Sequence, residues 1–146
     1  MTEPRLRSVL VVDDDEDDRF IASRALRKSG CVDYSFAACD GQEALQLFAD
    51  RAHARALHAD AFPPTLTILD INMPRMNGIE FLEALDAMKL PIDAQTDVVV
   101  VLSSSDAPED RATAAEFDLV KGYLVKPLTV TKTRALAAQF GQPAGA

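Results

Sequence analysis

The chain has 146 residues, which suits one domain, and 48% of them are hydrophobic, too many for a disordered chain. With 15 Lys and Arg against 23 Asp and Glu, the formal charge is −8, and such an acidic surface repels phosphate backbones and argues against nucleic-acid binding. Every apolar run is far shorter than the roughly 20 residues of a membrane span. No charged segment leads into a long apolar run at the start, so we expect neither a signal peptide nor a membrane anchor.

The first half of the chain alternates between strand and helix patterns. Residues 9–12 form an apolar, β-branched run that is typical of a strand buried on both faces. The acidic residues 15–18 favour a helix start, because the helix dipole stabilises negative charge there, and Gly30 ends this helix. Residues 32–38 predict a second strand. An apolar stripe predicts a second helix over 44–58.

The second half repeats this alternation after a break at Pro63 and Pro64. Its predicted elements are a strand at 66–69, a loop at 73–78, helices at 79–88 and 107–117 around a strand at 98–102, a strand at 123–125 and a helix at 136–140. The chain therefore predicts an α/β fold: a doubly wound, five-stranded parallel sheet with helices on both faces, in which right-handed crossovers leave few possible strand orders. Residues 1–8 and 141–146 are expected to be tails around one domain at 9–140, with no output domain.

The two cysteines predict free thiols. Cys31 and Cys39 flank one predicted strand. A strand of that length spans about 26 Å, far beyond the roughly 7 Å between bridged Cα atoms. Free thiols are typical of a reducing compartment, so we expect a cytoplasmic location.

Polar side chains follow four of the predicted strands at the ends where ligands bind in open α/β sheets. They are Asp13, Asp14 and Asp15 after the first strand, Asp70 after the third, Ser103, Ser104 and Ser105 after the fourth and Lys126 after the fifth. If these strands are neighbours, carboxylates, a hydroxyl and an ammonium group converge on one small volume. Any one of these residues alone would be read as a helix cap, a turn former or a surface group. Their coincidence at the correct strand ends predicts a site.

The chemistry of this cluster favours phosphoryl transfer. Crowded carboxylates repel one another and attract a cation, and Mg²⁺ prefers oxygen ligands together with a phosphate oxygen. Lys126 and Mg²⁺ would neutralise an incoming phosphoryl group, and Asp70 would attack its phosphorus. We interpret residues 15–18 as a helix cap only. His53 and His58 are five residues apart, which is not the spacing of paired metal ligands on a helix.

From about residue 9 to residue 140, the sequence strongly resembles the receiver domain of two-component response regulators. The matching segments are Val-Leu-Val-Val-Asp13-Asp14-Asp15, Leu-Asp70-Ile-Asn72-Met-Pro74-Arg-Met-Asn-Gly78, Val-Leu-Ser103-Ser104 and Gly-Tyr123-Leu-Val-Lys126-Pro127. Each segment is loosely specific alone, but in this order and spacing the set is highly specific. The resemblance implies a flavodoxin-like (βα)5 fold with its strands in the order 2-1-3-4-5. It also implies a signalling protein that accepts a phosphoryl group and catalyses its own phosphorylation and dephosphorylation, and not an ordinary enzyme.

The resemblance also implies a role for each pocket residue. Asp70 is the phosphoacceptor and a Mg²⁺ ligand, and Asn72 gives its backbone carbonyl to the metal. Asp13 and Asp14 form the acidic pair, in which Asp14 is the more direct metal ligand. Ser103, with the adjacent Ser104, contacts the phosphoryl group, Lys126 forms an ion pair with that group, and Tyr123 is a rotamer switch. Mg²⁺ is the implied cofactor.

The implied partners are a sensor histidine kinase, as phosphohistidine donor, and a downstream protein target or phosphotransfer protein. They also include a second copy of the chain, docked on the face of the elements at 107–117, 123–125 and 136–140. The long loop at 89–97 and the three serines from Ser103 look similar to stand-alone regulators that partner bacterial phytochromes.

Two other hypotheses stay open on the residues alone. Asp13-x-Asp15 also fits the haloacid-dehalogenase-like phosphatases, Mg²⁺ enzymes in which Asp13 would be the nucleophile and Lys126 an accessory residue. Against this, Asp17 stands where that family usually has Thr or Val, and Asp70 would have no role. The other hypothesis is a pseudo-receiver that serves only as a scaffold, and the complete set of pocket residues argues against it.

Overall fold

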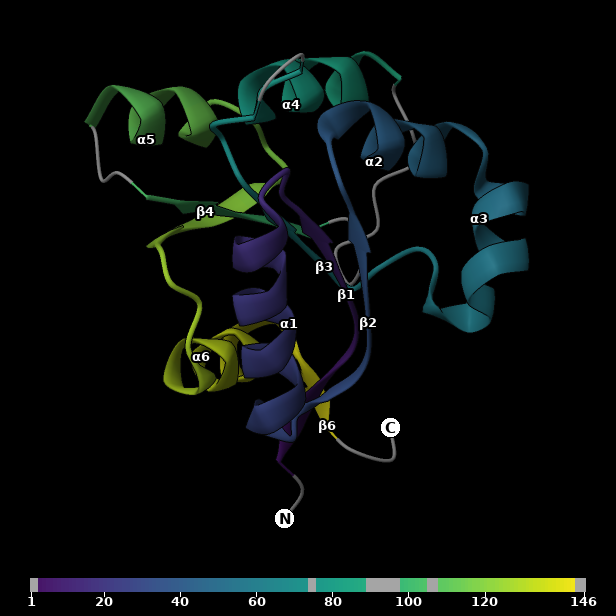
Figure 1. Ribbon diagram of the computed structural model, residues 1–146, viewed down its shortest axis with the longest axis vertical. Coiled ribbons are helices and arrows are strands. Elements are labelled where there is room, and N and C mark those ends of the chain that lie inside the picture. The colour runs from purple at the N-terminus through teal and green to yellow at the C-terminus, as the bar shows by residue number, and fades with distance from the viewer. Residues whose placement is uncertain (1–2, 74–75, 89–97, 105–107, 144–146) are drawn as a thin grey trace.

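The computed structural model describes residues 3–73, 76–88, 98–104 and 108–143. Its centre is a sheet of parallel strands in the order β2-β1-β3-β4-β5, which confirms the predicted fold class and strand order (Figure 1). These strands are β1 (Pro4–Val12), β2 (Val32–Ala38), β3 (Leu66–Leu69), β4 (Val98–Ser103) and β5 (Val120–Val125). Pro74, Ser105 and the predicted loop at 89–97 lie outside the described residues.

Helices cover both faces of the sheet. They are α1 (Glu16–Ser29) and α6 (Val130–Phe140) on one face, and α2 (Gly41–Ala49), α3 (Arg51–His58), α4 (Gly78–Ala87) and α5 (Pro108–Ala115) on the other (Figure 1). In β4, Val98, Val100 and Leu102 pack in the core with α1 and α6, whereas Val99 and Val101 pack on the opposite face. Alternate residues of a strand point to opposite faces, so this unbroken apolar run fills two core layers.

Local sequence signals fix the turns beside the ends of β1 and β3. Asp15 caps α1, because its side chain accepts hydrogen bonds from the backbone N–H groups of Asp17 and Asp18. The loop after β3 closes tightly at Gly78, where a Cβ atom would lie 2.7 Å from the carbonyl oxygen of Asp70. A side chain at 78 would therefore push α4 away from the strand end that carries Asp70.

Both predicted tails are wrong in part. The expected tail at 1–8 contains the first half of β1, where Leu6 and Ser8 pair with Val32 and Tyr34 of β2 and are fully buried. The expected tail at 141–146 contains β6 (Gln142–Pro143), which pairs with the start of β1 in the antiparallel sense. Charged residues interrupt the apolar pattern of residues 4–8, so their strand had no clear local signal.

The helices also differ in detail from the prediction. The second predicted helix is two helices, because Asp50 ends α2 and caps α3 by accepting a hydrogen bond from the N–H of His53. At the end of α3, His58 is half-buried, since its ring stacks on Phe36 at 4.2 Å and its Nδ1 lies 3.1 Å from the Tyr34 hydroxyl. The last helix, whose predicted apolar stripe covers residues 136–140, begins at Val130, and the last parallel strand begins at Val120 instead of residue 123.

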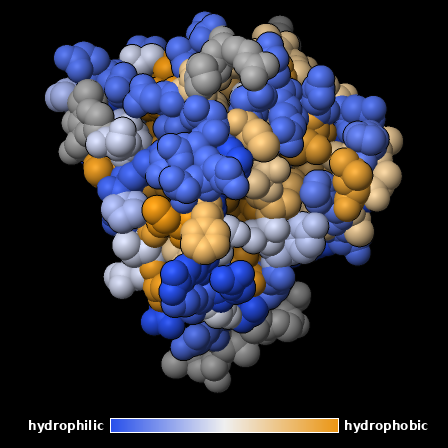
Figure 2. Space-filling model, viewed as in Figure 1, coloured by the Kyte–Doolittle hydropathy of each residue, from blue (hydrophilic) through white to orange (hydrophobic). Residues whose placement is uncertain are grey.

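The surface in Figure 2 is mostly hydrophilic towards the end of the molecule that holds both termini, whereas over α1 hydrophobic residues lie among hydrophilic ones, with Phe20 62% exposed. Hydrophobic residues gather more densely over α2 and α3, where Leu57 is 60% exposed (Figure 2). Within the described ranges, no helix combines the length and the apolar content that crossing a bilayer requires.

Candidate functional site

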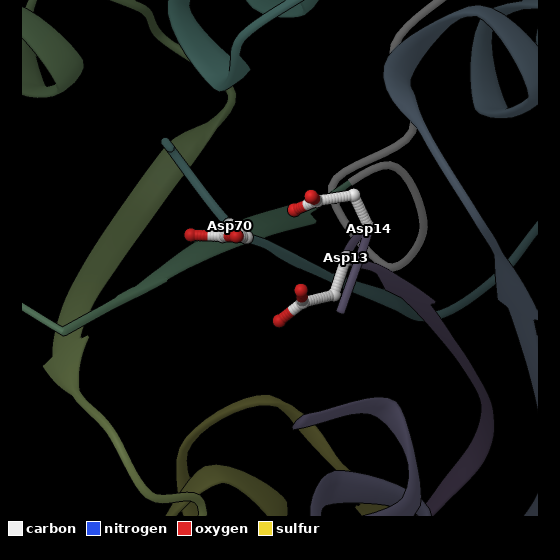
Figure 3. A group of neighbouring side chains, drawn as sticks. All are labelled: Asp13, Asp14 and Asp70. Atoms are coloured by element: carbon white, nitrogen blue, oxygen red, sulfur yellow. The ribbon is translucent and has the colours of Figure 1, made fainter. Parts of the chain in front are cut away.

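Three carboxylates meet where β1 and β3 end. Asp13 and Asp14 directly follow β1, Asp70 directly follows β3, and one oxygen from each lies within 4.8 Å of the others (Figure 3). Asp13 and Asp70 are buried, with 3% and 5% of their surfaces exposed, whereas Asp14 is exposed. The convergence predicted from the strand ends is therefore present in the fold.

The backbone holds two of these carboxylates firmly. The Asp70 N–H donates to the carbonyl of Val12 in β1 at 2.9 Å, which ties the two strand ends together. The Asp70 Oδ1 accepts the Asn72 N–H at 3.1 Å, and the Asp13 Oδ1 accepts the Asp15 N–H at 2.9 Å. Both side chains are thus positioned by the turns that follow their own strands.

Lys126 supplies the positive charge. Its N–H donates to the Ser103 carbonyl at 2.7 Å, so the end of β4 positions it. Its Nζ donates to Asp13 Oδ2 at 2.8 Å and to Asp18 Oδ2 at 2.7 Å, and lies 3.6 Å from Asp70 Oδ2. The ammonium therefore bridges α1 and the ends of β1 and β3.

The electrostatics of the site follow from this crowding. Burial raises the pKa of Asp70 to about 6, and the charges of Asp13 and Asp14 add to this, while Lys126 and the Asn72 N–H oppose it. Burial alone would lower the pKa of Lys126, but hydrogen bonds to Asp13 and Asp18, together with the charge of Asp70, raise it above its ordinary value. Lys126 is therefore a permanent cation beside a carboxylate that is costly to ionise.

The donor set fits a small divalent cation. Carboxylate oxygens are hard ligands of the kind that Mg²⁺ prefers, and Asp13, Asp14 and Asp70 place three of them together. Three carboxylates, those of Asp13, Asp18 and Asp70, lie within 3.6 Å of the Lys126 ammonium. The carboxylate of Asp14 lies beside two of them, which leaves an excess of negative charge for a cation to neutralise. Asn72 follows Asp70 by two residues and lies beside it, and the metal-binding role of its carbonyl stays a prediction.

The predicted switch residues lie between the site and the α5–β5 surface. Ser103 is fully buried at the end of β4, and Ser104 beside it is exposed. Tyr123 is partly buried in β5, opposite Val101 of β4, and the Arg111 guanidinium lies over its ring at 5.0 Å. A cavity of about 320 Å³ opens beside Tyr123, between α5 and β5. Ser103 and Tyr123 thus lie on two paired strands, and their roles in a coupling stay predictions.

The sequence interpretation missed Asp18, which it treated as part of a helix cap. Asp15 does cap α1, but the Asp18 side chain binds Lys126. A signal for this existed, because Asp18 precedes Ala22 and Ala25 at helical spacing and so belongs to the stripe of α1 that faces the sheet.

Comparisons with known proteins agree on one family. A family model described as "Response regulator receiver domain" matches residues 9–138. The transcriptional regulatory protein PrrA of Mycobacterium tuberculosis is 35% identical over 99% of this chain, and the chain spans about half (54%) of its length. A probable chemotaxis protein CheY of Rhizobium etli is 31% identical over 91% of this chain and 92% of its own.

Solved structures agree with these sequence matches. The structure of the bacteriophytochrome response regulator AtBRR is similar with a TM-score of 0.70 and 26% identity, over 95% of this chain and 96% of that one. None of these comparisons supports the phosphatase hypothesis. That hypothesis also needs Asp13 as the nucleophile, although the Asp15 N–H and Lys126 already engage both oxygens of Asp13.

Proposed function

Because the chain belongs to the family of response regulator receiver domains, we propose that it accepts a phosphoryl group from a histidine kinase on Asp70 and thereby switches a protein-binding surface. One observation carries the choice of Asp70. It lies buried at the end of β3, and its Oδ2 faces the Lys126 ammonium at 3.6 Å, beyond hydrogen-bond distance. This oxygen is thus available to attack a phosphorus atom held near the ammonium.

The chemistry is a transfer between two nucleophiles. An Asp70 oxygen forms a bond to phosphorus while the P–N bond of the donor phosphohistidine breaks, and the electron pair stays on the imidazole nitrogen, which takes a proton from solvent. Lys126 neutralises charge on the phosphoryl oxygens. Mg²⁺ held by Asp14, Asp70, Asp13 and the Asn72 carbonyl would supply the remaining charge neutralisation when bound.

The experiment is phosphorylation by acetyl phosphate with Mg²⁺, followed by intact mass and peptide mapping. We expect one phosphoryl group at Asp70 in the wild-type chain and none in Asp70→Asn. Asp60→Asn is the control, because Asp60 is an exposed aspartate outside the site and its loss should leave labelling unchanged. Label that persists in Asp70→Asn but disappears in Asp13→Asn would contradict the proposal and revive the phosphatase hypothesis.

We further propose that the signal leaves the site through Ser103 and Tyr123. Phosphorylation puts about two negative charges on Asp70. The Ser103 hydroxyl would hydrogen-bond the new oxygens and draw the end of β4 inward, and Tyr123 would then turn towards the vacated space. The cavity between α5 and β5, lined by Arg111, Ala114 and Tyr123 among others, lies on the surface that this movement reshapes. We place the docking site of a downstream protein, or of a second copy of the chain, on the α5–β5–α6 face.

Beryllofluoride, which mimics the phosphoryl group, tests this coupling. Ser103→Ala should still bind it but show smaller amide NMR shifts around Tyr123 than the wild-type chain, because one hydrogen bond to a charged group, worth about 1.5–3 kcal/mol, is lost. Shifts of equal size in both proteins would refute the route. Sedimentation with and without beryllofluoride tests self-association.

We also propose a bacteriophytochrome as the kinase, on the strength of the likeness to AtBRR. Phosphotransfer from an autophosphorylated bacteriophytochrome should be faster than from a histidine kinase without a phytochrome sensor. Equal rates from both donors would contradict this pairing.

A further inference from the structure

The hydrogen bond between Asp18 and Lys126 has no place in the phosphoryl-transfer chemistry described above. Asp18 lies in the first turn of α1, and its Oδ2 accepts from the Lys126 ammonium at 2.7 Å. Asp70, the proposed nucleophile, lies 3.6 Å from the same nitrogen. The ammonium is therefore held closer to α1 than to the reacting carboxylate.

We propose that Asp18 is a positioning residue that competes with the phosphoryl group for Lys126 and so favours the unphosphorylated state. This inference rests on the proposed function, in which Lys126 pairs with the phosphoryl oxygens at Asp70. An ammonium has three N–H donors. In the present structure two of these donors bind Asp13 and Asp18, and the nitrogen lies 3.6 Å from Asp70 Oδ2, so it must move away from its present partners to bind a group at Asp70.

Burial decides which of the two contacts gives way. The Asp13 side chain is 4% exposed, so leaving it without Lys126 would strand a buried charge. The Asp18 side chain is 36% exposed, and water can replace the ammonium there at little cost. When a phosphoryl group draws the ammonium towards Asp70, the contact with Asp18 is therefore the one that breaks.

The helix makes Asp18 an effective competitor. Its backbone N–H donates to the capping carboxylate of Asp15 at 3.1 Å, so the position of Asp18 at the start of α1 does not depend on its contact with Lys126. Losing the contact with Asp18 is consequently a cost of phosphorylation that a neutral side chain would remove. The cost has an upper limit, because a half-exposed ion pair contributes little.

The test measures the affinity for beryllofluoride in the presence of saturating Mg²⁺, by NMR titration of the full chain. Asp18→Asn should bind about two- to fivefold more tightly than the wild-type chain, the range expected for a half-exposed ion pair. Asp18→Glu keeps the charge and should restore affinity close to that of the wild type. Thermal unfolding of each variant in the absence of ligand establishes that the fold is intact.

Asp17→Asn is the matched control. It removes the same charge from the next residue of the same helix, where the side chain is exposed and only the N–H binds Asp15. Its affinity should stay at the wild-type value.

Three results would overturn the proposal. An equal gain in beryllofluoride affinity in Asp17→Asn and Asp18→Asn would indicate a general effect of net charge. Unchanged affinity in Asp18→Asn would show no competition, and weaker binding in that variant would mean that Asp18 holds Lys126 in place for beryllofluoride. If the wild-type chain fails to bind beryllofluoride at all, the proposed function itself fails.

Discussion

The two ends of the sheet hold opposite kinds of interaction. At the carboxyl ends of β1 and β3, Asp13, Asp14 and Asp70 crowd together with like charge (Figure 3). At the amino end of β1, Arg5 donates to the Asp33 carboxylate at 2.7 Å and to the Gly30 carbonyl at 2.7 Å. The first end holds more negative charge than its one ammonium, Lys126, can neutralise, and the second holds a balanced set of hydrogen bonds and an ion pair.

The amino end also joins the two ends of the described chain. β6 pairs with Pro4 and Arg5, so the segment after α6 closes over the start of β1, and both termini lie at this end of the molecule (Figure 1). Repulsion between carboxylates is therefore present at the end of the sheet where a bound divalent cation would relieve it. Removing a negative charge at Asp70 or Asp14 should therefore stabilise the metal-free fold while impairing function, and disrupting the contacts at the amino end should destabilise the fold while leaving function intact.

The largest effect on stability is expected from Asp70→Asn. The pKa of Asp70 is raised to about 6, so its ionised form is less favourable in the fold than in the unfolded chain. This cost is absent below the ordinary pKa, grows as the pH rises towards 6 and is complete above it. Asp70→Asn should therefore raise the free energy of unfolding by about 2–3 kcal/mol at pH 7.5 without Mg²⁺.

Urea unfolding at two pH values checks this prediction. The gain should shrink below about 1 kcal/mol at pH 4, where Asp70 is protonated in the fold and only partly ionised in the unfolded chain. Added Mg²⁺ should stabilise the wild-type chain more than the variant. A gain of equal size at both pH values would show that the carboxylate charge is not its cause.

A smaller effect of opposite sign is expected from Gly141→Ala. A Cβ atom at 141 would overlap the carbonyl oxygen of Ala137 and lie 2.8 Å from that of Arg5, so β6 could not stay paired with β1. We expect a loss of about 1–2 kcal/mol in the free energy of unfolding. Amide exchange should become faster in β6 and at the start of β1, while beryllofluoride affinity should not change.

Gly122→Ala is the control for this substitution. Its Cβ would lie 3.5 Å from the Val100 side chain, an ordinary contact, so the same chemical change in β5 should be tolerated. Equal losses in the two variants would mean that the close approach at Gly141 is not the reason for the instability.

The site at the carboxyl ends of the strands was predictable from sequence because the signals that mark each strand end are local. The bounds of β2 and β3 agree with the predicted ranges, since apolar runs end where Asp or a turn begins. A parallel sheet then brings the strand ends together, and this alone places Asp13 and Asp70 beside Lys126. The signal needed only the order of polar residues at strand ends.

The amino end was not predictable in this way, because its contacts join residues that are far apart in the chain. Nothing in the run from Pro4 to Ser8 indicates that Gln142 will pair with Arg5. The same limit explains why Asp18 was missed. Its backbone N–H binds the helix-capping Asp15, which is a local contact, but its side chain binds Lys126, which is 108 residues away in the chain. Local rules fix where a helix starts and not what its polar residues bind.

The smallest effect on stability is expected from Asp14→Ala, and it separates charge relief from metal binding. Asp14 is exposed, so water already screens its repulsion with Asp13 and Asp70, and its removal should stabilise the metal-free fold by less than about 1 kcal/mol. The same change should weaken Mg²⁺ binding at least about tenfold, because losing a ligand costs no less than losing an outer partner of one. Asp17→Ala removes an equal charge nearby and should leave Mg²⁺ affinity almost unchanged. The affinity for Mg²⁺ is measured by fluorescence or NMR titration. If Asp14→Ala and Asp17→Ala bind Mg²⁺ with the same affinity, Asp14 is not a metal ligand and acts only through its charge.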